Sequence, residues 1–163
     1  MTEIQNRDQL KERVEKKLMD ILSQGYKAHY ILKKVLKDDT LFVDNKDILD
    51  VIFIVREEIS DNKNRPEPFS PAKLLIATDY GILILQEGFE EITDNYLGYS
   101  MQKIYYKNMD SVKLDICMLN GKFKVYSGGS ELVVIEFETT KYFKDFEEFI
   151  KIIHDNKVTE CNK

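Results

Sequence analysis

The stretch KLLIATDYGILILQ, residues 73–86, decides the fold. Four apolar residues precede the segment TDYG and four more follow it. Two short apolar runs around a glycine-containing turn are typical of a β-hairpin, because each run is too short for a helix. We expect Gly81 to supply a positive φ to the turn and Asp79 to hydrogen-bond its own backbone. Because both runs are apolar at consecutive positions, both faces of this hairpin need cover.

Strand-like patterns surround the hairpin. The other strands are expected at residues 51–55, 100–109, 111–120, 122–126 and 131–138, which makes about seven in all. The dipeptides Asn120-Gly121 and Gly128-Gly129 predict tight turns between the last three strands. Short hairpin connections of this kind predict antiparallel pairing.

Two polar segments interrupt the strands. Residues 60–71 hold all three prolines of the chain and predict a loop. Residues 87–99 carry four acidic side chains and no basic one. They lack the ligand spacing of a Ca²⁺-binding loop, so we interpret them as a solvated connection.

Helical periodicity is present at both ends. Residues 6–24 repeat apolar positions at helical spacing, with Asn6 and Gln9 as a capping box and Gly25 as the terminating glycine. A second amphipathic segment, within residues 26–37, carries lysines opposite its apolar side. It predicts a helical hairpin packed on the sheet, or the helix-turn-helix of a DNA reader; the missing third helix and net charge of −5 favour packing.

The last predicted element is a C-terminal helix capped by Thr139 or Thr140. Its broad apolar stripe consists of Tyr142, Phe143, Phe146, Phe149, Ile150 and Ile153. Such a stripe predicts a buried helix face. From Lys157 onward no pattern remains, and we expect the tail to fray.

The composition of the 163 residues is 43% hydrophobic and 33% charged, which is typical of one globular domain with a small appendage. A net charge of −5 argues against broad binding of nucleic acid or anionic membranes. No apolar run has the length of a transmembrane helix, and the N-terminus lacks a signal-peptide core. We therefore expect a cytoplasmic protein.

No catalytic or metal-binding motif is evident. Cys117 and Cys161 lack metal-ligand spacing, and we expect both to be free thiols. His29 and His154 have no cysteine, serine or aspartate at a recognisable catalytic spacing. We therefore expect no enzymatic activity, no cofactor and no metal.

Two motifs carry a resemblance to a known family. LLIATDYGILIL (residues 74–85), followed after a polar gap by KIYYKNMDSVKL (residues 103–114), resembles the bacterial pleckstrin-homology (PH)-like domains, particularly the YokE-like PH group. SGGSELVVIEF and YFKDFEEFIKII, residues 127–137 and 142–153, are similar to that family's last strand and closing helix. The chain has no tryptophan, and Phe146 with Phe149 would stand in the closing helix instead.

The resemblance implies an α+β fold. It would be a PH-like antiparallel β-barrel or sandwich of about seven strands, closed by a C-terminal helix and preceded by an N-terminal helical hairpin. The expected divisions are residues 1–40 for the helical appendage, 46–156 for the PH-like domain and 157–163 for the frayed tail.

Such a domain implies a non-enzymatic binding module with a protein partner. A homodimer is one variant, because the outward-facing apolar residues Leu132 and Val134 need cover. The partner is expected at the two polar segments, where the candidate contact residues are Lys63, Arg65, Phe69, Lys73 and Tyr96.

Two alternatives remain open. The first is a sensor of anionic lipid or a membrane surface, which would use Lys63, Arg65 and Lys73 together with Lys122 and Lys124. The second is a DNA-binding regulator acting through residues 26–37.

Overall fold

The computed structural model describes residues 3–25, 31–32, 48–58, 69–93 and 96–161. Its elements are α1 (Glu3–Ser23), β1 (Ile48–Ile54), β2 (Glu57–Glu58), β3 (Phe69–Ser70), β4 (Lys73–Thr78), β5 (Gly81–Thr93), β6 (Tyr96–Tyr105), the 3₁₀ helix η2 (Tyr106–Asn108), β7 (Ser111–Cys117), β8 (Asn120–Ser127), β9 (Ser130–Glu138) and α3 (Thr139–Cys161). The strands form antiparallel sheets in the orders β1-β4-β5-β6, β7-β8-β9 and β2-β3. The fold class is α+β, as expected.

The hairpin at the centre of the sequence is confirmed as the centre of the four-stranded sheet. Strands β4 and β5 pair from Lys73 opposite Gln86 to Ala77 opposite Ile82. We predicted that Asp79 would hold the turn. In the structure the hydroxyl of the buried Thr78 spans it and donates to the Gly81 carbonyl at 2.9 Å. Gly81 does not have a positive φ. A glycine is needed there because a Cβ would overlap the backbone of Ile104.

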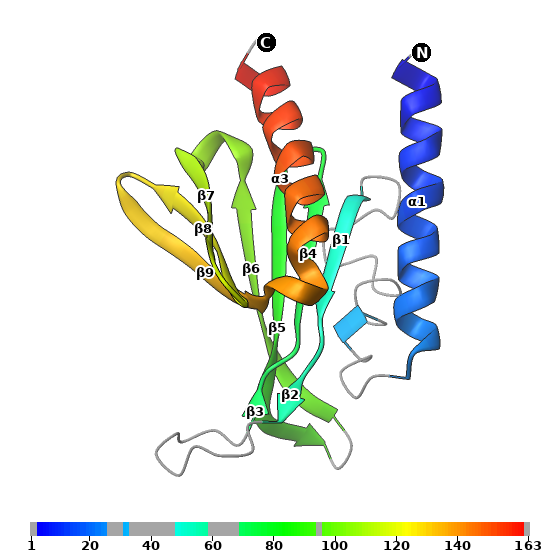
Figure 1. Cartoon of the computed structure of the whole chain (residues 1–163), viewed down its shortest axis with the longest axis vertical. Helices are drawn as coiled ribbons and strands as arrows, with labels where there is room; N and C mark the ends of the chain where they lie inside the picture. The colour runs from blue at the N-terminus through cyan, green and yellow to red at the C-terminus, as the bar shows by residue number, and fades with distance from the viewer. Residues whose placement is uncertain (1–2, 26–30, 33–47, 59–68, 94–95, 162–163) are drawn as a thin grey trace.

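Both faces of this sheet are covered, as the doubled apolar runs predicted. One face packs with Phe146 and Phe149 of α3 in the larger core cluster. The other face packs with Val14 of α1 and with the buried residues Ile31 and Leu32. The remainder of the expected second helix lies outside the described residues. Figure 1 shows α1 and α3 on different sides of β1.

The two larger sheets do not close into a barrel. No strand of β1-β4-β5-β6 pairs with a strand of β7-β8-β9 in the part of the chain that the structure describes. The barrel form of our prediction is therefore wrong. The physical reason is that α3 packs between the sheets, so Phe123 of one sheet and Ile84 of the other share a core with Phe146. Figure 1 shows this helix in the angle between them.

The predicted solvated connection at residues 87–99 is wrong. Strand β5 continues to Thr93, and β6 begins at Tyr96. Glu87 is only 1% exposed. Its carboxylate accepts a hydrogen bond from Arg56 Nε at 2.9 Å and is paired with the same guanidinium through its second oxygen. The acidic side chain is tolerated inside the fold because a buried charge that is paired and hydrogen-bonded costs far less than an isolated one.

The turn between β7 and β8 lies two residues earlier than Asn120-Gly121. Met118 and Leu119 form it, and Met118 has a φ of 51°. Gly121 instead lies within β8, where a Cβ would run into the ring of Phe137. The Gly128-Gly129 turn is confirmed, with φ values of 58° and 76°.

Several element ends also differ from the sequence-based expectations. Helix α1 begins at Glu3, so Asn6 is inside the helix and does not cap it, whereas Gly25 has the expected positive φ of 68°. The strand predicted at residues 100–109 is shorter at its end: β6 ends at Tyr105, and the 3₁₀ helix η2 follows it from Tyr106. Helix α3 continues to Cys161, and Lys157 Nζ donates to the Tyr106 carbonyl at 3.4 Å. The helix therefore extends past Lys157, where the sequence showed no helical pattern.

Candidate functional site

The structure does not bring the five candidate contact residues together into a described site. Lys63 and Arg65 lie outside the described residues. Phe69 begins β3 and Tyr96 begins β6, so both belong to strands and not to loops; their side chains also lie outside the described part. Only the Lys73 side chain can be placed.

Lys73 is a half-buried residue at the start of β4. Its Nζ donates to the carbonyl of Pro71 at 3.4 Å. Burial lowers the pKa of this lysine, although the nearby carboxylates of Glu136 and Glu57 act in the opposite direction. A partly desolvated lysine with acidic neighbours is a poor cation for an anionic head group.

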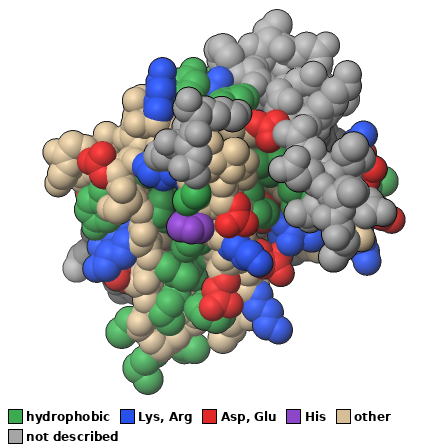
Figure 2. Space-filling view, turned by 90° about the horizontal axis from the view of Figure 1, so that it is seen from above, with side chains coloured by type: hydrophobic (Ala, Val, Ile, Leu, Met, Phe, Trp, Pro, Cys, Tyr) green, Lys and Arg blue, Asp and Glu red, His purple; other side chains and the backbone are tan. Residues whose placement is uncertain are grey.

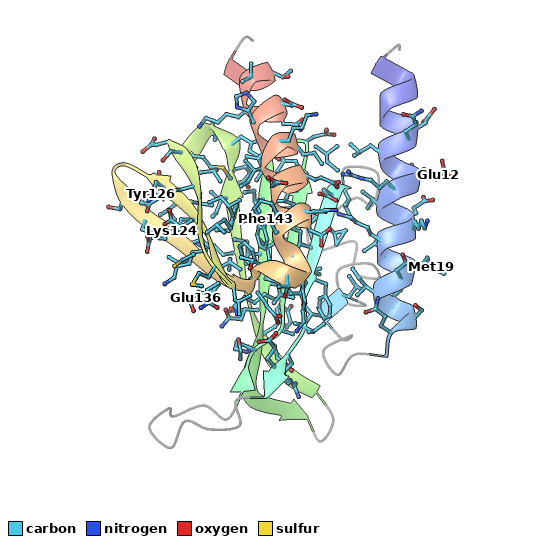
Figure 3. The ribbon with its side chains drawn as sticks, viewed as in Figure 1. Glu12, Met19, Lys124, Tyr126, Glu136 and Phe143 are labelled. Carbon is cyan, nitrogen blue, oxygen red and sulfur yellow. The ribbon has the colours of Figure 1, made fainter. Side chains whose placement is uncertain are left out.

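One described surface with a distinct chemistry is the outer face of the three-stranded sheet. This outer face consists of Lys113, Asp115, Lys122, Lys124, Tyr126, Glu131, Leu132, Val134 and Glu136. Figure 3 shows Lys124, Tyr126 and Glu136 on this sheet, on the opposite side of the molecule from Met19 of α1. The alternation of each strand sends these side chains away from the core.

Opposite charges on the outer face are paired, both between neighbouring strands and within β7. Lys124 Nζ lies 3.2 Å from a carboxylate oxygen of Asp115 and 3.7 Å from one of Glu131. Lys122 Nζ lies 2.8 Å from Glu136, and Lys113 Nζ lies 2.9 Å from Asp115. The face therefore combines three lysines with three carboxylates and has no excess of either sign.

Two of these residues have shifted pKa values. Hydrogen bonds from Lys113 and then Lys124 lower the pKa of Asp115. The hydrogen bond to Asp115 raises the pKa of Lys124. Both shifts favour the charged forms of Asp115 and Lys124. Tyr126 adds a hydroxyl that donates to Glu131 at 3.2 Å.

Two aliphatic side chains are exposed among these charges. Leu132 is 41% exposed and Val134 is 37% exposed. Leu132 is the extra residue of a β-bulge, because Val125 pairs with Val133 and the adjacent Tyr126 pairs with Glu131. The sequence-based prediction that these two apolar residues lack cover within the chain is confirmed for the part of the protein that the structure describes.

The face is held rigidly from behind. The inward side chains of β9 are Val133, Ile135 and Phe137, all buried in the larger core. The ring of Phe137 stacks on that of Phe146 at 4.1 Å between centroids. The Thr139 hydroxyl at the start of α3 donates to the Met118 carbonyl at 2.8 Å and fixes the β7–β8 turn. The outer face is therefore backed by packed core side chains.

A second charge cluster joins α1 to the rest of the fold. Asp50 of β1 is fully buried, and its Oδ1 lies 3.0 Å from Lys17 Nζ and 3.5 Å from a terminal nitrogen of Arg13. The same two cations also contact α3: Lys17 Nζ lies 3.4 Å from Asp145, and a terminal nitrogen of Arg13 lies 2.8 Å from Glu148. Burial raises the pKa of Asp50, although Lys17 and Arg13 act against it. Asp50 is the buried end of this cluster, whereas Asp145 and Glu148 are 40% and 52% exposed.

Side chains of both signs are also mixed at one end of the molecule (Figure 2). Figure 2 shows lysine or arginine, aspartate or glutamate and apolar side chains interspersed over the end of the molecule seen from above. Among the described residues, no three histidine, cysteine, aspartate or glutamate side chains gather to hold a metal ion. Cys117 is exposed and free.

Sequence reasoning found part of this surface. The alternation of residues 111–120 and 131–138 indicated which side chains face outward. The ion pairs depend on which strands are neighbours and on their register, and these follow from the hairpin turns, one of which was placed two residues late.

Comparisons with known proteins give no relative: no family model matches the chain, and no curated protein or solved structure matches it. Within the described residues, no helix has the length and apolar character needed to cross a membrane.

Proposed function

We propose that this protein is a non-enzymatic interaction module of PH-like type, whose protein partner docks on the outer face of the three-stranded sheet. The PH-like part of the proposal is supported by the order of elements: four strands in one antiparallel sheet, three in a second, and a closing C-terminal helix. The two sequence motifs that resemble the family fall in β4–β5 and in the segment from β6 to β7.

One observation carries the choice of surface. Leu132 and Val134 are exposed next to charges that already pair with one another. Covering these aliphatic side chains with a partner would remove apolar area from water without stranding an unpaired charge. Protein–protein interfaces combine an apolar centre with a polar rim, and here Leu132 and Val134 would form the centre and the ion pairs the rim.

The paired lysines favour a protein partner over an anionic membrane. Lys122 and Lys124, which the lipid alternative would use, are engaged by Glu136, Asp115 and Glu131. Sedimentation with vesicles of phosphatidylserine and phosphatidylcholine at low salt tests the alternative. Binding that disappears on replacing Lys122 and Lys124 with glutamine would favour the lipid reading over ours.

The DNA alternative has no support from the described residues. Ile31 and Leu32 are buried against the four-stranded sheet, and the rest of residues 26–37 lies outside the described part. Salt-dependent retention of the full chain on duplex DNA would revive this alternative.

Quantitative affinity capture tests the proposed surface. We expect a partner that is retained by the wild-type chain and lost with the double variant Leu132→Ser/Val134→Ser. The matched control is Met19→Ser, which replaces a residue 67% exposed on α1, on the opposite side of the molecule. Identical protein profiles for all three baits would contradict the proposal.

A further inference from the structure

The edge of β7 is the starting point for an inference about self-association. Strand β7 pairs with β8 on one side only, and no strand in the described ranges pairs with its other side. An unpaired strand edge is a template for another strand. The sequence of β7 is Ser-Val-Lys-Leu-Asp-Ile-Cys, with Leu114 at its centre.

The side chains of β7 are arranged symmetrically about Leu114. Val112 and Ile116 lie two positions to either side of it, and Lys113 and Asp115 lie one position to either side. The strand therefore reads apolar, basic, apolar, acidic, apolar. This pattern is its own complement when a second copy runs antiparallel about a two-fold axis at Leu114.

We propose that two copies of this chain pair antiparallel along β7, with Leu114 opposite Leu114 of the second copy, so that two three-stranded sheets become one six-stranded sheet. In this register Lys113 of each copy lies opposite Asp115 of the other. Within one chain Lys113 Nζ already lies 2.9 Å from Asp115, so pairing would exchange this contact for one between the copies. Side chains directly opposite in an antiparallel pair have Cβ atoms about 4.5–5.5 Å apart, which is within reach of an ion pair.

Apolar side chains also meet in this register. Val112 of one copy lies opposite Ile116 of the other, and the two Leu114 side chains face one another. Ile116 is 44% exposed in the single chain, and Val112 and Leu114 are only partly buried at the rim of the core. Pairing would extend that core across the two-fold axis.

Neighbouring registers are disfavoured by charge. Moving the axis to Lys113 places the two Lys113 side chains opposite one another, and moving it to Asp115 does the same for Asp115. A shift by one pairing position would bring an outward side chain opposite an inward one. A charged residue on an edge strand usually discourages pairing, but here the two charges select one register and one partner.

The inference goes beyond the proposed function because it concerns the free edge of β7 and a second copy of the chain, whereas the proposed partner docks around Leu132 and Val134; Lys113 and Asp115 belong to both surfaces. It is therefore tested with the purified full chain alone, in the absence of any other protein. Failure of the dimer leaves the capture experiment intact, and failure of the capture experiment leaves the dimer intact.

Charge reversal followed by a charge swap provides the main test, read by sedimentation velocity over a concentration series. We expect a wild-type dimer, a monomer for Lys113→Asp, and a restored dimer for Lys113→Asp/Asp115→Lys. The matched control is Lys144→Asp, which reverses the charge of an exposed lysine on α3 and should remain a dimer. Far-ultraviolet circular dichroism confirms that each variant is folded.

Thiol cross-linking tests the register. In a Cys117→Ser/Cys161→Ser background, Leu114→Cys should be captured as a dimer by a short bismaleimide, because residue 114 faces its own copy. The Cys117 thiols of the two wild-type copies should not be cross-linked, since they lie six positions, or about 20 Å, apart along the paired strands. A wild-type monomer throughout the series would overturn the proposal. So would a dimer that Lys113→Asp does not weaken and that the thiol at position 114 does not capture.

Discussion

Phe146 lies where α3 meets both larger sheets. It is fully buried, stacks on Phe137 at 4.1 Å and packs on Phe123 at 5.4 Å between ring centroids. We expect Phe146→Ala to lower the free energy of unfolding by about 3–5 kcal/mol, because it leaves a cavity that the two sheets cannot collapse to fill. Urea denaturation measures this change. Phe143→Ala, at a half-buried position of the same helix, is the control and should cost clearly less.

The buried pair of Arg56 and Glu87 gives a second prediction. Arg56→Met would leave the Glu87 carboxylate buried with only the amide of Ala72, at 3.2 Å, as a described donor. We expect a loss of about 3–5 kcal/mol in the free energy of unfolding. The double variant Arg56→Met/Glu87→Leu should recover much of that loss.

Its control is an exposed pair at the surface. Lys141→Met removes a lysine 3.5 Å from Glu57 and 2.7 Å from Glu138, all well exposed, and should change the stability by no more than about 1 kcal/mol. Equal losses for Arg56→Met and Lys141→Met would mean that burial of Glu87 is not the cause.

Asp50 predicts a pH dependence. Its folded-state pKa is raised by burial, so the folded protein holds the proton more tightly than the unfolded chain does. The contribution of Asp50 to stability therefore falls as pH rises from about 4 through the raised value. Over this pH range the free energy of unfolding of the wild type should fall relative to that of Asp50→Asn. Urea denaturation at several pH values measures both. The opposite trend would show that Lys17 and Arg13 outweigh burial.

At the scale of elements, α1 is a cover for the four-stranded sheet. Val14 is 4% exposed and packs in the cluster that includes Leu74 and Leu83, whereas Met19 of the same helix is 67% exposed. We expect Val14→Asp to cost about 3 kcal/mol or more and to increase the binding of an apolar dye, because it places a charge against the sheet. Met19→Asp should change neither. If both variants behave like wild type, α1 does not cover this face.

The elements differ in how well the sequence predicted them. The β4–β5 hairpin was predictable because apolar residues on consecutive positions need cover on both faces, whatever surrounds them. The β5–β6 extension was not, since Glu87 reads as a solvated residue unless Arg56 is known to lie beside it. The β7–β8 turn was misplaced because Gly121 is required by the ring of Phe137, a contact between strands, and not by the turn.

At the scale of the whole molecule, the class of fold was predictable and the closure of the sheets was not. Local periodicity indicated about seven strands and a closing helix, and the two larger sheets contain four and three strands. Whether two sheets join edge to edge depends on how far α3 enters between them, which no local pattern records. The ion pairs of the candidate surface were not predictable for a similar reason, because they depend on the register of three neighbouring strands.

The central parts of β4 and β5, residues 74–77 and 82–85, are enclosed on every side: each has a paired strand on both edges and a packed layer on both faces. Their amide protons can exchange with solvent only when the whole molecule opens, whereas those of β7 and β9, at sheet edges, can exchange through local opening. Hydrogen exchange should therefore give β4 and β5 the same opening free energy as global unfolding, with lower values at β7. A β4 that exchanged as fast as β7 would mean that its cover opens without unfolding the domain.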